Sequence, residues 1–332
     1  MSEGRVTTLG KLRTRALRPP KVGIDPSRPI AVRWDVERGV RVARRPTFTV
    51  FLAGAECPFT CLFCDLWRHT LDGPTPAGAL PRQLEIAIAE AGDAPPAGET
   101  THDPGPRTAP AIKLYNASNF FDARAVPPAD DRAIAEACAP FARVTVETHA
   151  RLVGDRAATL ADRLAGRLEI AMGLETIHPG VLPRLDKGMT LADFEGAVAW
   201  AREHVVGTRA FVLVGLPWVA ADDFATWAVR SATYAAELGV ERVSLIPLRA
   251  GNGALDELAR RGELEPVRLA HIEEALERCL DGLAGRTIVE ADLWDAERLD
   301  ACEACHGARI ARLAAANLEQ AIGPRDPCGC ER

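Results

Sequence analysis

Six short runs of apolar and β-branched residues recur along this chain, and segments with helical periodicity lie between them. Nearly continuous apolar strands that alternate with helices indicate a parallel sheet covered by helices. With right-handed crossovers, such a sheet either curls into a partial barrel or forms a doubly wound sheet. We expect an α/β fold, a partial (β/α)6 barrel of the TIM type. The expected strands are 47–54, 111–116, 143–149, 168–175, 210–217 and 242–248, with a further strand at 287–290.

Helical patterns fill most of the intervals between these strands. Thr190, with Asp193 three residues later, predicts a capped helix start, and Gly239 predicts a helix end. Residues 92–110 are rich in Pro, Gly, Thr and Asp and predict a surface insertion. The expected helices are 80–91, 129–139, 155–165, 190–205, 221–238, 265–283 and 308–321.

Three cysteines lie in one short loop, residues 57–64 (CPFTCLFC), just after the first expected strand. Thiolates are soft ligands that select iron–sulfur clusters, zinc or copper. Three cysteines leave one iron of a four-iron cluster without a protein ligand. A partial zinc site and three unrelated core cysteines are the alternatives. Because barrels carry their chemistry at the carboxyl ends of the strands, we expect Cys57, Cys61 and Cys64 to mark an active site.

The net charge of −6 is unevenly distributed along the 332 residues. Residues 1–50 contain twelve Lys and Arg against four Asp and Glu. We interpret residues 1–28 as an extended basic arm, followed by a small hairpin within 30–44. Such an arm either contacts a polyanion such as RNA or is a solvated tail. Without a membrane-length apolar run or a secretory signal, we expect a reducing cytoplasm.

A second group of cysteines lies near the carboxyl terminus, as two close pairs on either side of the helical pattern at 308–321. Four thiolates in tetrahedral array favour a structural zinc, while an auxiliary iron–sulfur cluster or no metal are the alternatives. His306 is a spare candidate ligand. These cysteines are Cys302, Cys305, Cys328 and Cys330.

The cysteine loop resembles the signature of the radical S-adenosylmethionine (SAM) superfamily. Together with the stretches 113–122, 146–153, 169–176, 185–194 and 244–264, it resembles the Elongator-catalytic-subunit/MiaB-like type, and within it the archaeosine synthase radical SAM group and its bacterial relatives. The resemblance implies a [4Fe–4S] cluster that cleaves SAM to a 5′-deoxyadenosyl radical, with an electron donor such as flavodoxin or ferredoxin. It also implies a modified base in tRNA as substrate. Residues 116–119 (NASN) depart from the Thr-Ser-Gly-Ser-like run of archaeal members, which leaves the substrate open.

Polar residues at the strand ends meet at one mouth in such a barrel, where SAM needs partners for its amino group, ribose and adenine. The alternative is that these polar residues only cap helices or form hydrogen bonds with loop backbone. We expect Asn116, Ser118, Asn119, Glu147, Glu175, Phe63, Gly215 and Ile246 to bind the cofactor. His149 and Lys187 are candidate acid–base groups.

The expected organisation is a basic extension with a small hairpin over 1–46, the barrel over 47–285 and a cysteine-bearing segment over 286–332. The main hypothesis is a radical SAM enzyme of lyase or transferase type. Its substrate is either a tRNA base or a small molecule or peptide from a biosynthetic pathway. A non-enzymatic scaffold with zinc at both cysteine groups is the third hypothesis.

Overall fold

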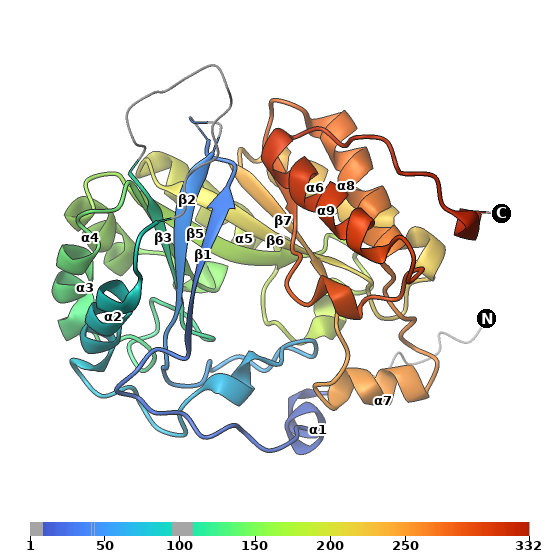
Figure 1. The fold of residues 1–332 in the computed structure, drawn as a ribbon. Helices are drawn as coiled ribbons and strands as arrows, with labels where there is room; N and C mark the ends of the chain where they lie inside the picture. Colours follow the sequence, from blue (N-terminus) through green and yellow to red (C-terminus); the bar gives the residue numbers. More distant parts are fainter. Residues whose placement is uncertain (1–8, 41, 43, 95–108, 332) are drawn as a thin grey trace.

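A single curved sheet of eight strands organises the part of the chain that this computed structural model describes, residues 9–40, 42, 44–94 and 109–331. The strands follow one another in sequence order across the sheet (Figure 1). The first pair is antiparallel and the other pairs are parallel. The strands are β1 (Ala31–Glu37), β2 (Arg45–Phe51), β3 (Ala111–Tyr115), β4 (Arg143–Glu147), β5 (Leu168–Glu175), β6 (Gly207–Val214), β7 (Arg242–Pro247) and β8 (Ile288–Ala291).

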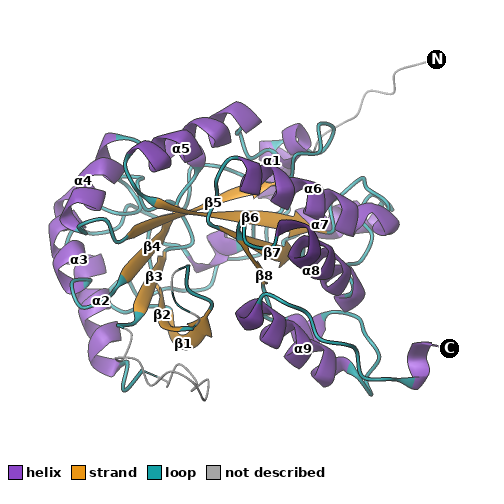
Figure 2. Ribbon diagram, turned by 90° about the horizontal axis from the view of Figure 1, so that it is seen from above, coloured by secondary structure: helices purple, strands orange, loops and turns teal. Residues whose placement is uncertain are grey.

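The convex face of this sheet, seen end-on in Figure 2, is covered by the helices α2 (Ala79–Glu90), α3 (Asp131–Ala137), α4 (Asp155–Arg163), α5 (Leu191–Glu203), α6 (Phe224–Glu237) and α8 (Leu269–Leu283). Helix α9 (His306–Glu319) lies at the β8 edge of the sheet, and the short helices α1 (Lys11–Ala16) and α7 (Ala254–Arg260) lie beside each other beyond the carboxyl ends of the strands (Figure 1). The predicted cap at Thr190 is confirmed, because its hydroxyl accepts from Asp193 N at 3.2 Å. The predicted end of α6 at Gly239 is also confirmed, with φ of 90°.

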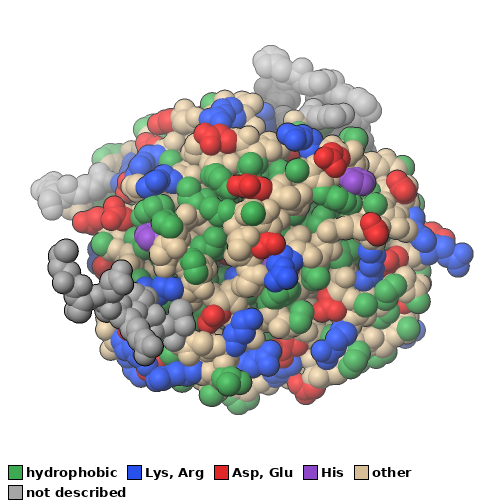
Figure 3. Space-filling view, turned by 180° about the vertical axis from the view of Figure 1, so that it is seen from behind, with side chains coloured by type: hydrophobic (Ala, Val, Ile, Leu, Met, Phe, Trp, Pro, Cys, Tyr) green, Lys and Arg blue, Asp and Glu red, His purple; other side chains and the backbone are tan. Residues whose placement is uncertain are grey.

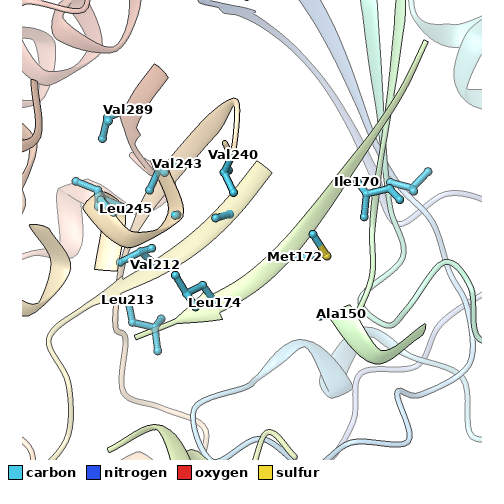
Figure 4. Packing of buried hydrophobic residues seen from close by; sticks show 14 of the residues in the cluster. Ala150, Ile170, Met172, Leu174, Val212, Leu213, Val240, Val243, Leu245 and Val289 are labelled. Carbon is cyan, nitrogen blue, oxygen red and sulfur yellow. The ribbon is translucent and has the colours of Figure 1, made fainter. Parts of the chain in front are cut away.

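Apolar side chains that alternate along the strands point outward and pack beneath the helices. Val243 and Leu245 of β7 lie beside Val212 of β6 in this layer (Figure 4). The alternate residues of each strand point to the concave face, where side chains from strands that are not neighbours in the sheet come into contact. Arg209 of β6 pairs with Glu37 of β1 at 2.9 Å. The sheet is therefore a partial barrel with a lined interior, as expected.

The amino end of the barrel interior is a charged floor. Its cations and carboxylates pair across the interior: Lys113, Arg143, Arg209 and Arg242 with Glu37, Glu169, Glu241 and Glu290. A cavity of about 430 Å³ opens beside it. This floor lies at the end of the strands opposite to the cysteine loop, so it belongs to the scaffold.

Helix α9 protects the exposed edge of the sheet. Asn317 exchanges two hydrogen bonds with the backbone of Ala291 at 2.8 and 2.9 Å, and Gln320 does the same with Val289 at 2.9 Å. These side chains occupy the donors and acceptors that edge strand β8 would otherwise present to another chain.

The further strand expected at 287–290 is confirmed as β8, which brings the parallel part of the sheet to seven strands. Three details differ from the expectations. The hairpin pairs β1 with β2, so the predicted boundary at residue 46 falls inside β2. Helix α7 was not predicted, and α1 interrupts the predicted extended arm. Most of the predicted insertion, 95–108, lies outside the described residues, as do 1–8 of the arm. No helix in the described part is long and apolar enough to cross a membrane.

Candidate functional site

The cysteine loop leaves the carboxyl end of β2 and passes over the mouth of the barrel. Cys57, Cys61 and Cys64 are all partly buried and unpaired by disulfides. Burial raises the pKa of each thiol, to about 12 for Cys61. Three shielded thiols in one loop need a cationic ligand to ionise, and a metal centre supplies that charge. The donor set therefore fits an iron–sulfur cluster.

Backbone contacts from two other loops hold the cysteine loop in shape. Leu62 N donates to Leu185 O at 2.8 Å. The fully buried amide of Asn252 donates to Leu62 O at 2.8 Å and to Cys64 O at 3.3 Å. Asn252 was missed by the sequence analysis, although its place between two glycines after the sixth expected strand was a usable signal. The loop conformation thus depends on segments far away in the sequence.

A buried ion pair lies next to the thiols. Lys187 Nζ contacts Glu175 Oε1 at 2.6 Å, and the side chains are 9% and 6% exposed. Burial alone would lower the pKa of Lys187, but Glu175, Cys61 and Cys57 together raise it. A Cβ on Gly173 would lie 1.8 Å from Glu175 Oε1, so the pair requires glycine there. Lys187 thus provides a fixed positive charge beside the expected cluster.

The loop after β3 brings polar groups toward Cys57. Asn119 donates from Nδ2 to Cys57 Sγ at 3.0 Å and accepts from His149 N at 2.7 Å. Asn116 Nδ2 and Ser118 Oγ are buried without a hydrogen-bond partner. Buried polar atoms are normally paired, so these two orphans indicate a place for a polar ligand.

The side chain of Glu147 forms a hydrogen bond with the same loop, residues 116–119. Its carboxylate accepts from Asn116 N at 2.8 Å, and burial raises the pKa of Glu147 to about 7. It therefore shapes the 116–119 loop in this structure, and it retains acceptor capacity for a ligand.

His149 stacks on the ring of Phe59, with centroids 3.9 Å apart. Its Nδ1 accepts from Arg151 N and its Nε2 contacts Lys187 O at 3.1 Å, which identifies Nε2 as the protonated nitrogen. Burial lowers the pKa of His149 to about 4. These contacts favour a role in holding the cysteine loop over the predicted acid–base role.

The remaining predicted cofactor residues lie around the same end of the barrel. The ring of Phe63 is 5.9 Å from Lys187 Nζ. Gly215 directly follows β6 with φ of 96°, and Ile246 is half-buried in β7. The predicted site residues thus lie at or near the carboxyl ends of six strands, β2 to β7.

The basic arm lies against the cysteine loop. Arg15 Nε donates to Thr60 Oγ1 at 3.0 Å, within the loop itself. Arg18 and Lys21 pair with Glu56, next to Cys57, at 2.7 and 2.8 Å. Neither the polyanion nor the solvated-tail interpretation predicted this arrangement. On the face opposite to that of Figure 1, basic and acidic side chains are intermixed (Figure 3).

The second cysteine group converges around the start of α9. The four sulfur atoms all lie within 4.8 Å of one another, and Cys302–Cys328 and Cys305–Cys330 are each 3.8 Å apart. Zinc–sulfur bonds of about 2.3 Å in a tetrahedron place sulfurs roughly 3.8 Å apart. His306 contacts Ala296 O instead of the sulfurs.

Comparisons with known proteins identify the fold. No family model matches the chain. An uncharacterized protein of Methanocaldococcus jannaschii is 24% identical over 281 residues, 81% of this chain and 73% of that protein. The archaeal Elp3 of Methanocaldococcus infernus, solved without its residues 1–46, matches with a TM-score of 0.50 at 14% identity, over 71% of this chain and 59% of that chain. SuiB of Streptococcus suis bound to S-adenosylmethionine matches with a TM-score of 0.50 at 12% identity, over 76% of this chain and 52% of SuiB.

This chain has the fold of radical SAM enzymes. It spans less than two thirds of each of these two solved chains. The expected family resemblance is therefore confirmed at the level of fold, and the partial barrel with it.

Proposed function

We propose that this protein is a radical SAM enzyme whose cluster is held by Cys57, Cys61 and Cys64. The observation that carries the proposal is their placement, as three shielded thiols in one loop at the carboxyl end of β2. A reduced [4Fe–4S] cluster held there would supply one electron to SAM, whose cleavage to methionine and a 5′-deoxyadenosyl radical would provide the group for hydrogen abstraction. Flavodoxin or ferredoxin is the expected electron donor.

The chain's own residues supply the surroundings. Lys187 offsets negative charge at the thiolates, and Asn119 donates to Cys57 Sγ. Asn116 Nδ2 and Ser118 Oγ are free to bind the polar groups of SAM. Gly215 and Ile246 offer an apolar wall for adenine, and Phe63 shields the thiols from water.

The test is anaerobic reconstitution with iron and sulfide, followed by reduction in the presence of SAM. We expect about four irons at the loop and formation of 5′-deoxyadenosine. Cys61→Ala should abolish both, whereas Cys328→Ser should leave both intact. Recovery of intact SAM alone with several reductants would contradict the proposal. About two zincs without chromophore would favour the scaffold hypothesis.

For the tail we propose a structural zinc bound by Cys302, Cys305, Cys328 and Cys330. The match of the 3.8 Å sulfur separations to a zinc tetrahedron supports this. Metal analysis should find one zinc that Cys302→Ser removes and Cys61→Ala does not. Iron that Cys302→Ser removes would instead identify an auxiliary cluster.

For the substrate we propose a modified base in tRNA, supported by the family resemblance. The basic arm no longer supports it, since Arg18 and Lys21 pair with the body. Filter binding of tRNA to the intact chain should weaken steeply with salt. Absence of binding at low salt would favour a small molecule or peptide.

A further inference from the structure

Four aromatic rings form a row across the concave face of the barrel. They come from β6, β3, β2 and the segment after β8, which do not all neighbour one another in the sheet. Phe211 and Tyr115 have ring centroids 6.5 Å apart, Tyr115 and Phe51 6.1 Å, and Phe51 and Trp294 5.7 Å. We call these four residues the aromatic row.

The row lies between the cysteine loop and the charged floor. Phe51 and Tyr115 are register partners and the last residues of their strands. Tyr115 directly precedes Asn116, whose side-chain Nδ2 is buried without a hydrogen-bond partner. Lys113, which belongs to the floor, is two residues earlier, or about 7 Å along the strand. The row is therefore the part of the interior that faces the site of the chemistry.

The rings are not sealed in the core. Phe51, Tyr115 and Phe211 are half-buried, although the residues next to them in their strands are nearly all buried. Trp294 is 46% exposed, and it is the one aromatic among the exposed large apolar side chains in the described part of the chain. Apolar rings left open in a barrel interior are available for a ligand.

Charges around the row suit a flat ring with polar edges. Lys113 Nζ lies 5.7 Å from the Tyr115 ring and Arg33 Cζ lies 5.4 Å from the Trp294 ring, so each cation faces an aromatic surface. Asp292 and Arg249 form a polar pair at the wall near Trp294, 3.5 Å apart. A stacked ring would find both donors and acceptors there.

We propose that the aromatic row binds a planar heteroaromatic ring of the substrate by stacking, below the cysteine loop. This rests on the proposed radical SAM function and assigns a place in the barrel to the ring of its substrate. An aliphatic chain would fill the space without using the ring faces, the cations on them or the polar pair.

The test compares two probes with the same sugar and phosphate on the reconstituted enzyme, saturated with SAM and not reduced. Guanosine 5′-monophosphate carries a planar base and ribose 5-phosphate does not. In saturation-transfer NMR titrations we expect guanosine 5′-monophosphate to bind with the strongest transfer to H8, the carbon-bound proton of its base. Ribose 5-phosphate should bind far more weakly, and because the phosphate is common to both, the arginines of the floor cannot explain a difference.

Variants then locate the binding. Phe211→Leu and Trp294→Leu should each weaken the affinity about 5- to 150-fold, the range for loss of one aromatic stacking partner. Trp200→Leu is the matched control, because Trp200 lies on α5 and stacks on His204 instead. Equal affinities in the three variants would overturn the proposal.

Two further outcomes would also overturn it. Equal binding of both probes to the wild-type enzyme, or no binding of either, would mean that the aromatic row does not bind a heteroaromatic ring. This result does not depend on whether any variant folds. Binding of guanosine 5′-monophosphate only when SAM is omitted would mean that the row holds the adenine of SAM. Production of 5′-deoxyadenosine in the same preparation tests the radical SAM proposal separately, since it does not depend on the row.

Discussion

Replacing Lys187 by methionine should destabilise the protein strongly, because it leaves the Glu175 carboxylate buried without its partner. The two side chains are 9% and 6% exposed and their charged atoms are 2.6 Å apart. Removal of one member of a buried pair costs about 3–5 kcal/mol of unfolding free energy. In the double variant Lys187→Met/Glu175→Gln no charge is left unpaired. We expect the double variant to recover roughly 1–3 kcal/mol relative to additivity.

The assay is anaerobic urea unfolding of the metal-free protein, followed for the four members of the cycle. Arg278→Ala is the control, since its pair with Glu274 is exposed and should contribute less than about 1 kcal/mol. A loss below about 1 kcal/mol for Lys187→Met, with strictly additive single changes, would refute the reasoning. It would mean that water or another group reaches Glu175 in place of Lys187.

Three other predictions concern the surroundings of the cysteine loop. Because burial raises the pKa of Glu147 to about 7, the folded state binds more protons than the unfolded state, and stability should fall as pH rises from about 4.5 to 7. Glu147→Gln should remove this slope in pH-dependent unfolding curves; an unchanged slope would contradict it. Gly173→Ala should cost several kcal/mol in the same assay because its Cβ collides with the buried ion pair, and a near-neutral result would contradict the predicted clash. Arg18→Ala, which loses Glu56 and the contact with the Trp67 ring, should cost about 1–2 kcal/mol and speed loss of iron to a chelator. Arg28→Ala, which removes an exposed ion pair, should change neither the stability nor the rate of iron loss. Equal effects of the Arg18 and Arg28 variants would show that the arm does not support the loop.

The aromatic row and the floor illustrate how the barrel interior is layered. Charges at the amino end pair with one another across the interior, so they close the bottom without a ligand. Rings follow, and then the polar strand ends and the thiols. This order places the thiols at the mouth of the barrel and the aromatic row directly beneath them, where we expect the substrate ring.

Much of the fold followed from local patterns. Apolar runs such as 168–175 predicted β5 at the residues where it occurs, and the Thr190 cap predicted the start of α5. The strand at 287–290 was less secure, because a four-residue run has little periodicity to measure. Helices α1 and α7 were missed because each is short and is stabilised by contacts with distant segments, such as Arg13 with Glu257.

The sequence by itself determined which cysteines can form the proposed metal sites: the spacings of four and three residues within one loop, and the two close cysteine pairs, are local properties of the chain. Only the tertiary structure decided what surrounds them. The arm's arginines lie on the cysteine loop, Asn252 holds its backbone, and the aromatic row closes beneath it. These are contacts between segments tens to hundreds of residues apart. Periodicity records which way a side chain points, but only the curvature of the sheet determines which distant side chain it meets.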